Sequence, residues 1–500
     1  MICYIFLAGL AVLFYVFVIH IYAKLWLLKL KHGKDVEISY FPLFGDYFYL
    51  TKSFKKYGDA MEIFKQRYQK NPNIKFVASN ILNKVFLFIH DPEYYKSVLV
   101  NHQSYTKVEI LYHPKLSSTS ILFGEPDKVK QQRNLLGEAF TFEKLKQRTP
   151  IINEVLLQKL EKEDKTDVLD FLTKTSSEII IKTFFCKELQ DIIVQGNDIT
   201  TEMIDLITQL GNMQMNDLYV SVKLALLGRK AFGFFPSKKE KLLDARIDRL
   251  IDGTLMPIIK NKIANYKANQ NQDFLDLYVN AYLNQKPNEP KITELELCQL
   301  FVSIVSAGTD TSSHQIAITL YYLGIDRKAQ EEIRQELINV VGDEVDIQPQ
   351  HLSKLVLLNA FIYEAFRVKS TVIQPLTRIA KESHYIQNLK IEKGTYVAAL
   401  TTAPSWSSKY FNDPNKFDYK RWLSQRPIQE DNGYVFVPFS AGGRNCIGQH
   451  MAMMTMKIMI GQILRKYDVI VDQTVQVTFP LVLFIQYSPK NLVKLEKRKL

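Results

Sequence analysis

The chain has 500 residues, of which 47% are hydrophobic and 23% charged, and its formal net charge is +12. Length alone suggests two or three domains, and the composition is ordinary for a chain that buries a large core. An anionic membrane surface or an acidic protein partner explains the positive charge, as does a diffuse solvated surface. The sequence shows no helix-turn-helix, zinc-finger spacing or basic tract interleaved with aromatic residues, so we expect no nucleic-acid partner.

Cysteine usage excludes a disulfide framework. The cysteines are far apart and none belongs to a CxxC pair: they are Cys3, Cys186, Cys298 and Cys446. This spacing indicates neither a zinc site nor a set of disulfides. It fits a reducing compartment.

The first segment of the chain predicts a membrane anchor. Ile2 to Ala23 is apolar except for His20, and about 20 such residues are what a helix needs to cross the hydrocarbon core. A cleaved signal peptide is the alternative, but the segment has no basic start and no small-residue cleavage site. Basic residues follow the span and do not precede it: Lys24, Lys29, Lys31 and Lys34. We therefore expect residues 1–23 to be an uncleaved anchor, with the rest of the chain in the cytosol.

The next elements in chain order are a short linker and a hairpin. Residues 24–45 form a basic linker that ends in the turn-forming stretch Phe41-Pro-Leu-Phe-Gly45. Two β-branched runs, Ile74–Ala78 and Lys84–Ile89, predict a β-hairpin. Asp91-Pro-Glu predicts a helix start with proline in the first turn.

The rest of the chain is mainly helical in pattern. Apolar residues recur at three and four positions from Val129 to about Ile338. Short strands are predicted at Tyr385–Ile391 and Thr395–Leu400 and again near the C-terminus. No flexible linker interrupts residues 46–500, so we expect one large, mainly α domain with a small β-sheet, an α+β fold.

A glycine-rich loop, Phe439-Ser-Ala-Gly-Gly-Arg-Asn-Cys-Ile-Gly448, presents one cysteine just before a helix expected to begin near Ile447. Gly442 and Gly448 would let the backbone turn tightly and approach a planar cofactor. The loop N–H groups and the helix N-terminus favour a thiolate at Cys446.

Two further side chains of this loop suit a cofactor. Arg444 offers a fixed charge for an anionic group, and Phe439 would pack against the cysteine sulfur or the ring. A buried structural cysteine in a Gly-rich turn is the alternative.

The loop resembles, at every fixed position of Phe-x-x-Gly-x-Arg-x-Cys-x-Gly, the haem-binding loop of the cytochrome P450 family of haem-thiolate monooxygenases. The resemblance covers roughly residues 40–490. It implies the cytochrome P450 fold, a haem b cofactor and Cys446 as the axial ligand of the iron. Residues 46–500 would then form the catalytic domain.

A second motif, Ala307-Gly308-Thr309-Asp310-Thr311-Ser312, lies inside the apolar helical run Leu297–Leu323. Glycine costs about 1 kcal/mol in a helix, and an unpaired buried carboxylate costs more. A local opening of the helix beside bound oxygen would explain both residues. Thr311 beside Asp310 can organise proton delivery, and the family has an acid–alcohol pair in the corresponding helix. A kinked helix with a solvated polar face is the alternative.

Glu364 and Arg367 stand three residues apart in Glu364-Ala-Phe-Arg367, so both side chains lie on one helix face and can pair. The resemblance adds Arg421 as the third member of a buried structural cluster that holds the cysteine loop.

Two more arginines resemble contacts to the haem propionates: Arg133 and, in Pro375-Leu-Thr-Arg378, Arg378. Each is also explained as a surface arginine. Val129 and Gln132 depart from the family, which often has tryptophan and a basic residue there, and this puts propionate anchoring by Arg133 in question.

The resemblance implies a monooxygenase that inserts one oxygen atom from O2 into a lipophilic substrate. The chain has no dinucleotide or flavin fingerprint, so electrons must come from a partner. The implied partners are the NADPH-dependent cytochrome P450 reductase of the endoplasmic reticulum and cytochrome b5, and the implied location is that membrane, with a single span. Lys457, Arg465 and Lys466 are candidate contacts for an acidic flavin domain.

Two alternatives from other classes stay open. One is an oxygen-independent haem-thiolate isomerase or dehydratase, and the other is a non-catalytic haem-binding membrane protein. Asp310 and Thr311 argue against both. By position, the resemblance assigns the substrate pocket to Tyr105–Phe123, Glu202–Leu227, Val305–Thr309, Val372–Leu376 and Phe479–Leu483.

Overall fold

The computed structural model describes most of the chain, namely residues 2–43, 45–81, 84–108, 111–122, 124–162, 165–185, 192–228, 231–267, 274–287, 289–342, 346–372, 376–424, 427–430, 432–480 and 487–498. The chain divides into two compact units. Unit 1 contains residues 1–108, 363–446 and 477–481, and unit 2 contains residues 109–362, 447–476 and 482–500.

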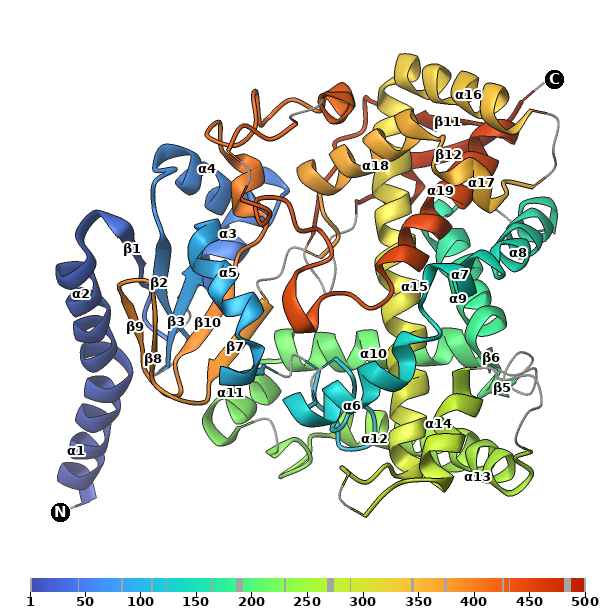
Figure 1. Ribbon diagram of the computed structural model, residues 1–500. Helices are drawn as coiled ribbons and strands as arrows, with labels where there is room; N and C mark the ends of the chain where they lie inside the picture. Colours follow the sequence, from blue (N-terminus) through green and yellow to red (C-terminus); the bar gives the residue numbers. More distant parts are fainter. Residues whose placement is uncertain are drawn as a thin grey trace. The chain divides into compact units, whose positions relative to one another are not determined.

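A six-stranded sheet forms the centre of unit 1. Its strands, in spatial order, are β1 (Val36–Ser39), β2 (Phe76–Ile81), β3 (Lys84–Ile89), β10 (Tyr396–Ala399), β7 (Leu376–Ala380) and β4 (Tyr105–Lys107). The β1–β2 and β3–β10 pairs are parallel and the remaining pairs are antiparallel. One face of the sheet packs on α2 and α5 through buried aliphatic and aromatic side chains. Figure 1 shows α2 running beside β1 and β2.

The N-terminal helix is longer than the sequence predicts. It continues without a break through α1 (Ile2–Phe14), the π-helical turn η1 (Tyr15–Ile19) and α2 (His20–His32). The stretch Leu7–Asp35 is long and apolar enough to cross a membrane. Residues 24–45, expected as a linker, therefore carry the end of this helix and strand β1, because no proline or glycine occurs between His20 and His32 to stop the helix.

The predicted hairpin is confirmed as β2–β3, although β2 extends into the expected turn. The start of α5 (Pro92–Val100) is also confirmed, since the side chain of Asp91 accepts a hydrogen bond from the Glu93 N–H at 3.0 Å. The strand expected at Tyr385–Ile391 is instead a separate small hairpin. Its strands are β8 (His384–Ile386) and β9 (Leu389–Ile391).

Short helices complete unit 1. They are η2 (Gly33–Asp35), α3 (Asp46–Tyr57), α4 (Glu62–Lys70), η3 (His102–Ser104), η7 (Ala403–Trp406), η8 (Tyr419–Leu423) and η9 (Gly442–Arg444). α18 (Val356–Val368) begins in unit 2, and its residues from Tyr363 onward belong to unit 1.

Unit 2 is built around one long helix, α15 (Glu294–Ile325), which packs against α9, α10, α13 and α19 (Figure 1). Its other helices are α6 (Pro126–Gly137), α7 (Phe142–Lys146), α8 (Thr149–Lys162), α9 (Val168–Phe184), α10 (Ile199–Asn216), α11 (Leu218–Leu227), α12 (Lys238–Leu250), η6 (Ile251–Leu255), α13 (Met256–Ala264), α14 (Phe274–Leu283), α16 (Arg327–Val341), α17 (Pro349–Leu352), α19 (Gln449–Lys466) and η10 (Lys490–Leu492). Its strands are the hairpin β5 (Ile193–Val194) and β6 (Asn197–Asp198), and the pair β11 (Tyr467–Val471) and β12 (Val493–Lys497). The expectation of a mainly α fold with a small sheet is confirmed.

Candidate functional site

In unit 1, Cys446 stands at the end of a tight loop that contains η9. Its backbone N–H donates to the carbonyl of Phe439 at 2.9 Å, and the Asn445 N–H donates to the carbonyl of Gly442 at 3.1 Å. These bonds close the loop on itself, and the side chain of Cys446 is exposed. The ring of Phe439 lies edge-on to that of Phe366 in α18, with 5.3 Å between the ring centroids, so an aromatic contact ties the loop to α18.

Gly442 is the glycine that this loop requires. Its φ is +73°, and a Cβ atom there would lie 2.3 Å from the carbonyl oxygen of Leu99 in α5. Gly448 differs from the expectation, because its φ of −89° is open to any residue. It is the N-cap of α19, which begins at Gln449, two residues after the expected position.

Glu364 is the centre of a buried hydrogen-bond cluster in unit 1. Arg367 donates to its two carboxylate oxygens from Nε at 2.9 Å and Nη2 at 2.7 Å. Arg421 donates from Nε at 3.2 Å, the Asp418 N–H at 2.8 Å and the Trp422 indole at 2.8 Å. Burial alone would raise the pKa of Glu364, but the hydrogen bonds and charge of Arg367 outweigh it and hold that pKa below its usual value.

The same cluster holds η7 and the segment that follows it. Arg367 also donates to the backbone carbonyls of Ser405, Pro414 and Lys416 at 2.8–2.9 Å. The structure thus assembles the predicted Glu-Arg-Arg group and adds Trp422 as a donor that the sequence did not indicate.

Arg378 is a buried cation in β7, with only 1% of its surface exposed. Burial lowers the pKa of this guanidinium to about 10. Its Nε and Nη2 atoms have no hydrogen-bond partner within the described part of the chain. Because buried donors are nearly always paired in folded proteins, this guanidinium is suited to an anionic group. The side chain of Arg444 in η9 is also buried.

In unit 2, the polar motif of α15 does not open the helix. The helix is continuous from Glu294 to Ile325, so the expected local opening is wrong. Close packing explains Gly308 instead, since a Cβ atom there would lie 2.8 Å from Cδ1 of Ile180 in α9. The hydroxyl of Thr311 donates to the carbonyl of Ala307 one turn earlier, at 2.7 Å.

Asp310 is buried in the same turn, and this burial raises the pKa of its carboxyl from 3.8 to about 7. The neighbouring hydroxyl of Thr309 is fully buried and has no hydrogen-bond partner among the described residues. A buried carboxyl with a raised pKa therefore stands between two threonines in the sequence of one helical turn.

Arg133 is half-buried on α6 of unit 2. The departure at Gln132 has a structural reason, because its amide donates to the carbonyl of Thr119 at 2.8 Å and to Glu296 of α15 at 2.9 Å. Lys128 pairs with the same carboxylate at 2.7 Å. Gln132 thus holds the segment before α6 against α15 within unit 2.

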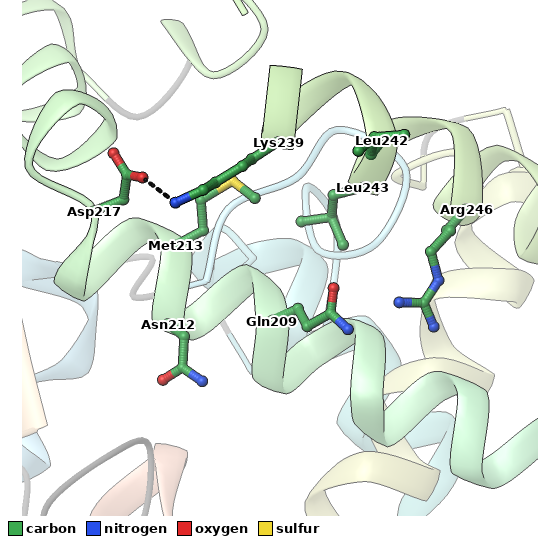
Figure 2. A pocket seen from close by; sticks show the side chains of 8 residues that line it. All are labelled: Gln209, Asn212, Met213, Asp217, Lys239, Leu242, Leu243 and Arg246. Carbon is green, nitrogen blue, oxygen red and sulfur yellow. Dashed lines mark hydrogen bonds and ion pairs between the residues drawn. The ribbon is translucent and has the colours of Figure 1, made fainter. Parts of the chain in front are cut away.

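A groove of about 450 Å³ lies between α10 and α12 of unit 2. It is lined by Gln209, Asn212, Met213, Asp217, Lys239, Leu242, Leu243 and Arg246. Figure 2 shows Asp217 paired with Lys239 at one end, at 3.4 Å, and Arg246 at the other. The groove overlaps the range 202–227 expected to line the substrate pocket, but none of the residues expected at the haem or in proton transfer lines it.

The comparisons with known proteins agree on one family. The family model described as Cytochrome P450 matches residues 38–495. The chain is 25% identical to Cytochrome P450 3A13 of Mus musculus over 407 residues, which cover 77% of this chain and 76% of that protein. It is 25% identical to Cytochrome P450 4X1 of Homo sapiens over 430 residues, 83% and 82% of the two chains. It is 22% identical to Cytochrome P450 3A56 of Fundulus heteroclitus over 480 residues, 91% and 90%.

The chain belongs to the cytochrome P450 family. As a cytochrome P450 it is a haem-dependent monooxygenase, its cofactor is haem b, and its electrons come from NADPH through a redox partner. One observation shows that the residues present fit this cofactor. Among the described residues, the Nε and Nη2 donors of buried Arg378 have no partner, and such donors suit a propionate.

The predicted site residues of this cytochrome P450 fall into two groups. Unit 1 holds Cys446, Arg444, Phe439, Gly442, Arg378, Glu364, Arg367 and Arg421. Unit 2 holds Ala307, Gly308, Asp310, Thr311, Arg133 and Gly448. Of the expected pocket segments, residues 109–110, Phe123, 373–375 and 481–483 lie outside the described residues.

The structure adds Thr309 to the expected site residues and gives Lys457 a role other than the expected one. Thr309 is part of the α15 motif, but only the structure shows that its hydroxyl is buried and has no partner in the described part of the chain. Lys457 was a candidate contact for the reductase. Its ammonium instead donates to the carbonyl of Leu352 at 2.8 Å, and burial lowers its pKa, so it is engaged inside unit 2.

Proposed function

We propose that this cytochrome P450 is a membrane-anchored enzyme that inserts one oxygen atom from O2 into a lipophilic substrate, with Cys446 as the ligand of the haem iron. The Cys446 loop carries the proposal. Its backbone bonds leave the thiol exposed, and α19 begins three residues later, so the helix N-terminus favours a thiolate.

Haem b, when bound, supplies oxygen activation, which a thiolate ligand favours by donating electron density to the iron. The chain itself would provide groups that hold and move protons taken up from solvent. Asp310, with a pKa of about 7, holds a proton and releases it near neutral pH. The hydroxyl of Thr311 passes the proton on when it exchanges its bond to the Ala307 carbonyl. The unpaired hydroxyl of Thr309 is a third member of this relay.

Arginine side chains bind the anionic edge of the cofactor. Arg378 is the strongest candidate, since its buried guanidinium has unpaired donors within the described chain. Arg444 and Arg133 complete the set. Glu364, Arg367 and Arg421 do not contact the cofactor, and their role is to hold the segment that precedes the cysteine loop.

The partners and location follow from the anchor and the charge. The lysines after the span, Lys24 to Lys34, place the catalytic part in the cytosol by the positive-inside rule. The electron donor is the NADPH–cytochrome P450 reductase of the endoplasmic reticulum membrane, with cytochrome b5 as a second donor, and the +12 net charge suits their acidic surfaces. Residues 1–23 span the membrane and residues 46–500 form the catalytic part.

Reconstitution tests this function. The full chain is combined with the reductase in vesicles, and a fatty acid, a steroid and a lipophilic xenobiotic are screened with NADPH and isotopically labelled O2. Label in an oxidised product, in amounts that depend on the reductase, is the expected result. In Asp310→Asn and Thr311→Ala, NADPH consumption continues while product falls, because reduced oxygen is released without insertion. Product formation without O2 or reductase would instead identify an isomerase or dehydratase.

A further inference from the structure

The segment from Tyr112 to Thr119 of unit 2 is neither helix nor strand, and it belongs to the range expected to line the substrate pocket. Connections of this kind are usually the more mobile parts of a protein. In this chain, however, the segment carries buried side chains, those of Tyr112, His113, Leu116 and Ser117. The contacts that hold the segment therefore decide whether it moves.

A buried glutamine of α10 binds the beginning of the segment. The Oε1 atom of Gln214 accepts a hydrogen bond from the Tyr112 N–H at 3.1 Å, and its Nε2 atom donates to the Tyr112 carbonyl at 2.6 Å. Both polar atoms of one side-chain amide are thus paired with the backbone of one residue. Because Gln214 is buried, breaking these bonds would leave polar groups unpaired in the interior.

Two more buried glutamines bind the rest of the segment from other helices. Gln299 of α15 donates from Nε2 to the Pro114 carbonyl at 2.9 Å and to the Ser118 hydroxyl at 3.0 Å. Its Oε1 atom accepts from the Thr119 N–H at 2.9 Å. Gln132 of α6 donates from Nε2 to the carbonyl of the same threonine at 2.8 Å. Three helices therefore hold the backbone of one short segment, at its beginning, middle and end.

Ion pairs add to these contacts but do not dominate them. Lys115 lies 2.5 Å from the carboxylate of Asp248 and 2.6 Å from that of Asp252. His113 lies 3.2 Å from the carboxylate of Asp244. These three carboxylates repeat every four residues along α12 and η6, so they repel one another, and Lys115 offsets this repulsion. Both partners of Lys115 are exposed, and such pairs are weak and screened by salt. The neutral glutamine contacts are therefore the main attachment.

The backbone of the segment is also bonded within itself. The His113 carbonyl accepts from the N–H groups of Leu116 at 3.1 Å and Ser117 at 3.0 Å. The His113 N–H donates to the Ser117 hydroxyl at 3.0 Å, and the Lys115 N–H donates to Nδ1 of His113 at 3.2 Å. If the segment swung open as a lid, it would have to break the glutamine contacts together and would deprive the buried amides of α10 and α15 of these partners.

We propose that Gln132, Gln214 and Gln299 are positioning residues that fix residues 112–119 as a rigid wall of the substrate pocket, so that this enzyme selects substrates by size and does not close a lid over them. This inference rests on the proposed function, because only that function gives unit 2 a substrate pocket beside the segment. A preformed wall removes the cost of ordering a loop on binding, but it does not yield to a larger molecule. The chain should therefore bind a narrow range of lipophilic substrates.

Hydrogen exchange of the full chain in detergent tests whether the segment is fixed. Gln214→Leu and Gln299→Leu keep a similar side-chain volume but remove both polar atoms. In each, the amides of residues 112–119 should exchange at least about tenfold faster than in the wild type. Gln209→Leu is the matched control, because the amide of Gln209, also in α10, donates to Asp205 of its own helix at 2.8 Å. This control should exchange like the wild type. Equal exchange in the wild type and in the two test variants would overturn the proposal.

The wild type alone distinguishes a fixed wall from a lid. Exchange is measured before and after saturation with 4-phenylimidazole, an aromatic ligand of haem iron. A fixed wall predicts equal exchange of residues 112–119 in both states. Exchange that slows by about tenfold or more on binding would show a closing lid and overturn the proposal. Because this measurement needs no substitution, the proposal stays testable if a variant does not fold.

Size selection supplies a readout that a general loss of stability would not change. The visible spectrum is titrated with 4-phenylimidazole and with a larger, biphenyl-substituted imidazole, and the ratio of the larger ligand's Kd to the smaller ligand's Kd is compared. In Gln214→Leu this ratio should fall by at least about fivefold, because the wall then yields to the larger ligand. In Gln209→Leu it should equal the wild-type ratio. Equal changes in both Kd values would contradict size selection. The exchange of the variants needs no haem, so the predicted exchange without any spectral response would support the fixed segment and contradict only the proposed function.

Discussion

Substitution of Glu364 by glutamine tests the buried cluster of unit 1. Glu364 accepts hydrogen bonds from both nitrogens of Arg367 and from Arg421, Asp418 and Trp422. Removing one partner of a buried ion pair costs about 3–5 kcal/mol, because the remaining charge stays buried without compensation. At roughly 2 °C per kcal/mol for a large domain, the apparent melting temperature of Glu364→Gln should fall by about 6–10 °C.

The assay is a thermal melt of the full chain in detergent at one fixed scan rate. Glu143→Gln is the matched control, since Glu143 also pairs with a basic residue three positions on, Lys146 at 2.8 Å, but is 79% exposed. An exposed pair contributes less than about 1 kcal/mol, so this variant should melt like the wild type. Folding lowers the pKa of Glu364, so the stability that its carboxylate contributes is present above the unfolded pKa and is lost as pH falls through the folded pKa. The difference in melting temperature between Glu364→Gln and the wild type should therefore shrink in acid. Equal melting of the two variants at neutral pH would refute this reasoning.

Other substitutions test the packing and electrostatics of the two motifs. Gly308→Val should destabilise unit 2 by about 1–3 kcal/mol, because the valine would clash with the side chain of Ile180. Adding Ile180→Ala to the same chain removes the clash and should restore the melting temperature. Gly442→Ala should lower the melting temperature more than Gly433→Ala. Both glycines have a positive φ, which costs about 1–3 kcal/mol for another residue, but of the two only Gly442 would also bring its Cβ atom to 2.3 Å from a backbone oxygen. Equal losses in melting temperature would contradict this close approach. Folding raises the pKa of Asp310 from 3.8 to about 7, so the folded chain loses stability as pH rises from the unfolded to the folded pKa, and the loss is level above the folded value. Asp310→Asn should therefore melt with the wild type near pH 3, move above it as pH rises to about 7, and keep an advantage of roughly 3–5 kcal/mol at about pH 8. A pH-independent difference in melting temperature would contradict the shifted pKa.

Local sequence patterns predicted the secondary-structure elements that are determined by residues close together in the chain. Asp91-Pro92 marks the start of α5 because the capping side chain and the proline act within one turn. The two β-branched runs predicted the β2–β3 hairpin because its strands are neighbours in the sequence.

Features that depend on distant residues were predicted less well. Gly308 and the buried carboxyl of Asp310 together suggested an opened helix, whereas the glycine is explained by close packing against Ile180 in α9. The end of the anchor at Ala23 was placed by hydropathy. The helix continues to His32 because one of its faces packs on a sheet that includes β2 and β3, which lie more than 40 residues further along the chain.

The candidate site likewise has features that the sequence predicts and features that only the structure reveals. The Cys446 loop and the Glu364–Arg367 pair are contiguous motifs, so the sequence indicated them. The two guanidinium nitrogens of Arg378 that have no partner among the described residues, and the buried hydroxyl of Thr309, depend on their surroundings, so only the structure reveals them.

The central claim, that Cys446 is the thiolate ligand of the haem iron, is tested most directly by spectroscopy. The full chain in detergent is reduced with dithionite, exposed to carbon monoxide and measured as a difference spectrum. A thiolate ligand places the Soret band far to the red of the position given by histidine. We predict the red-shifted band in the wild type and in Cys298→Ser, whose thiol is buried in α15, and its loss in Cys446→Ser. A band at the histidine position in the wild type, or a red-shifted band that survives Cys446→Ser, would contradict the account.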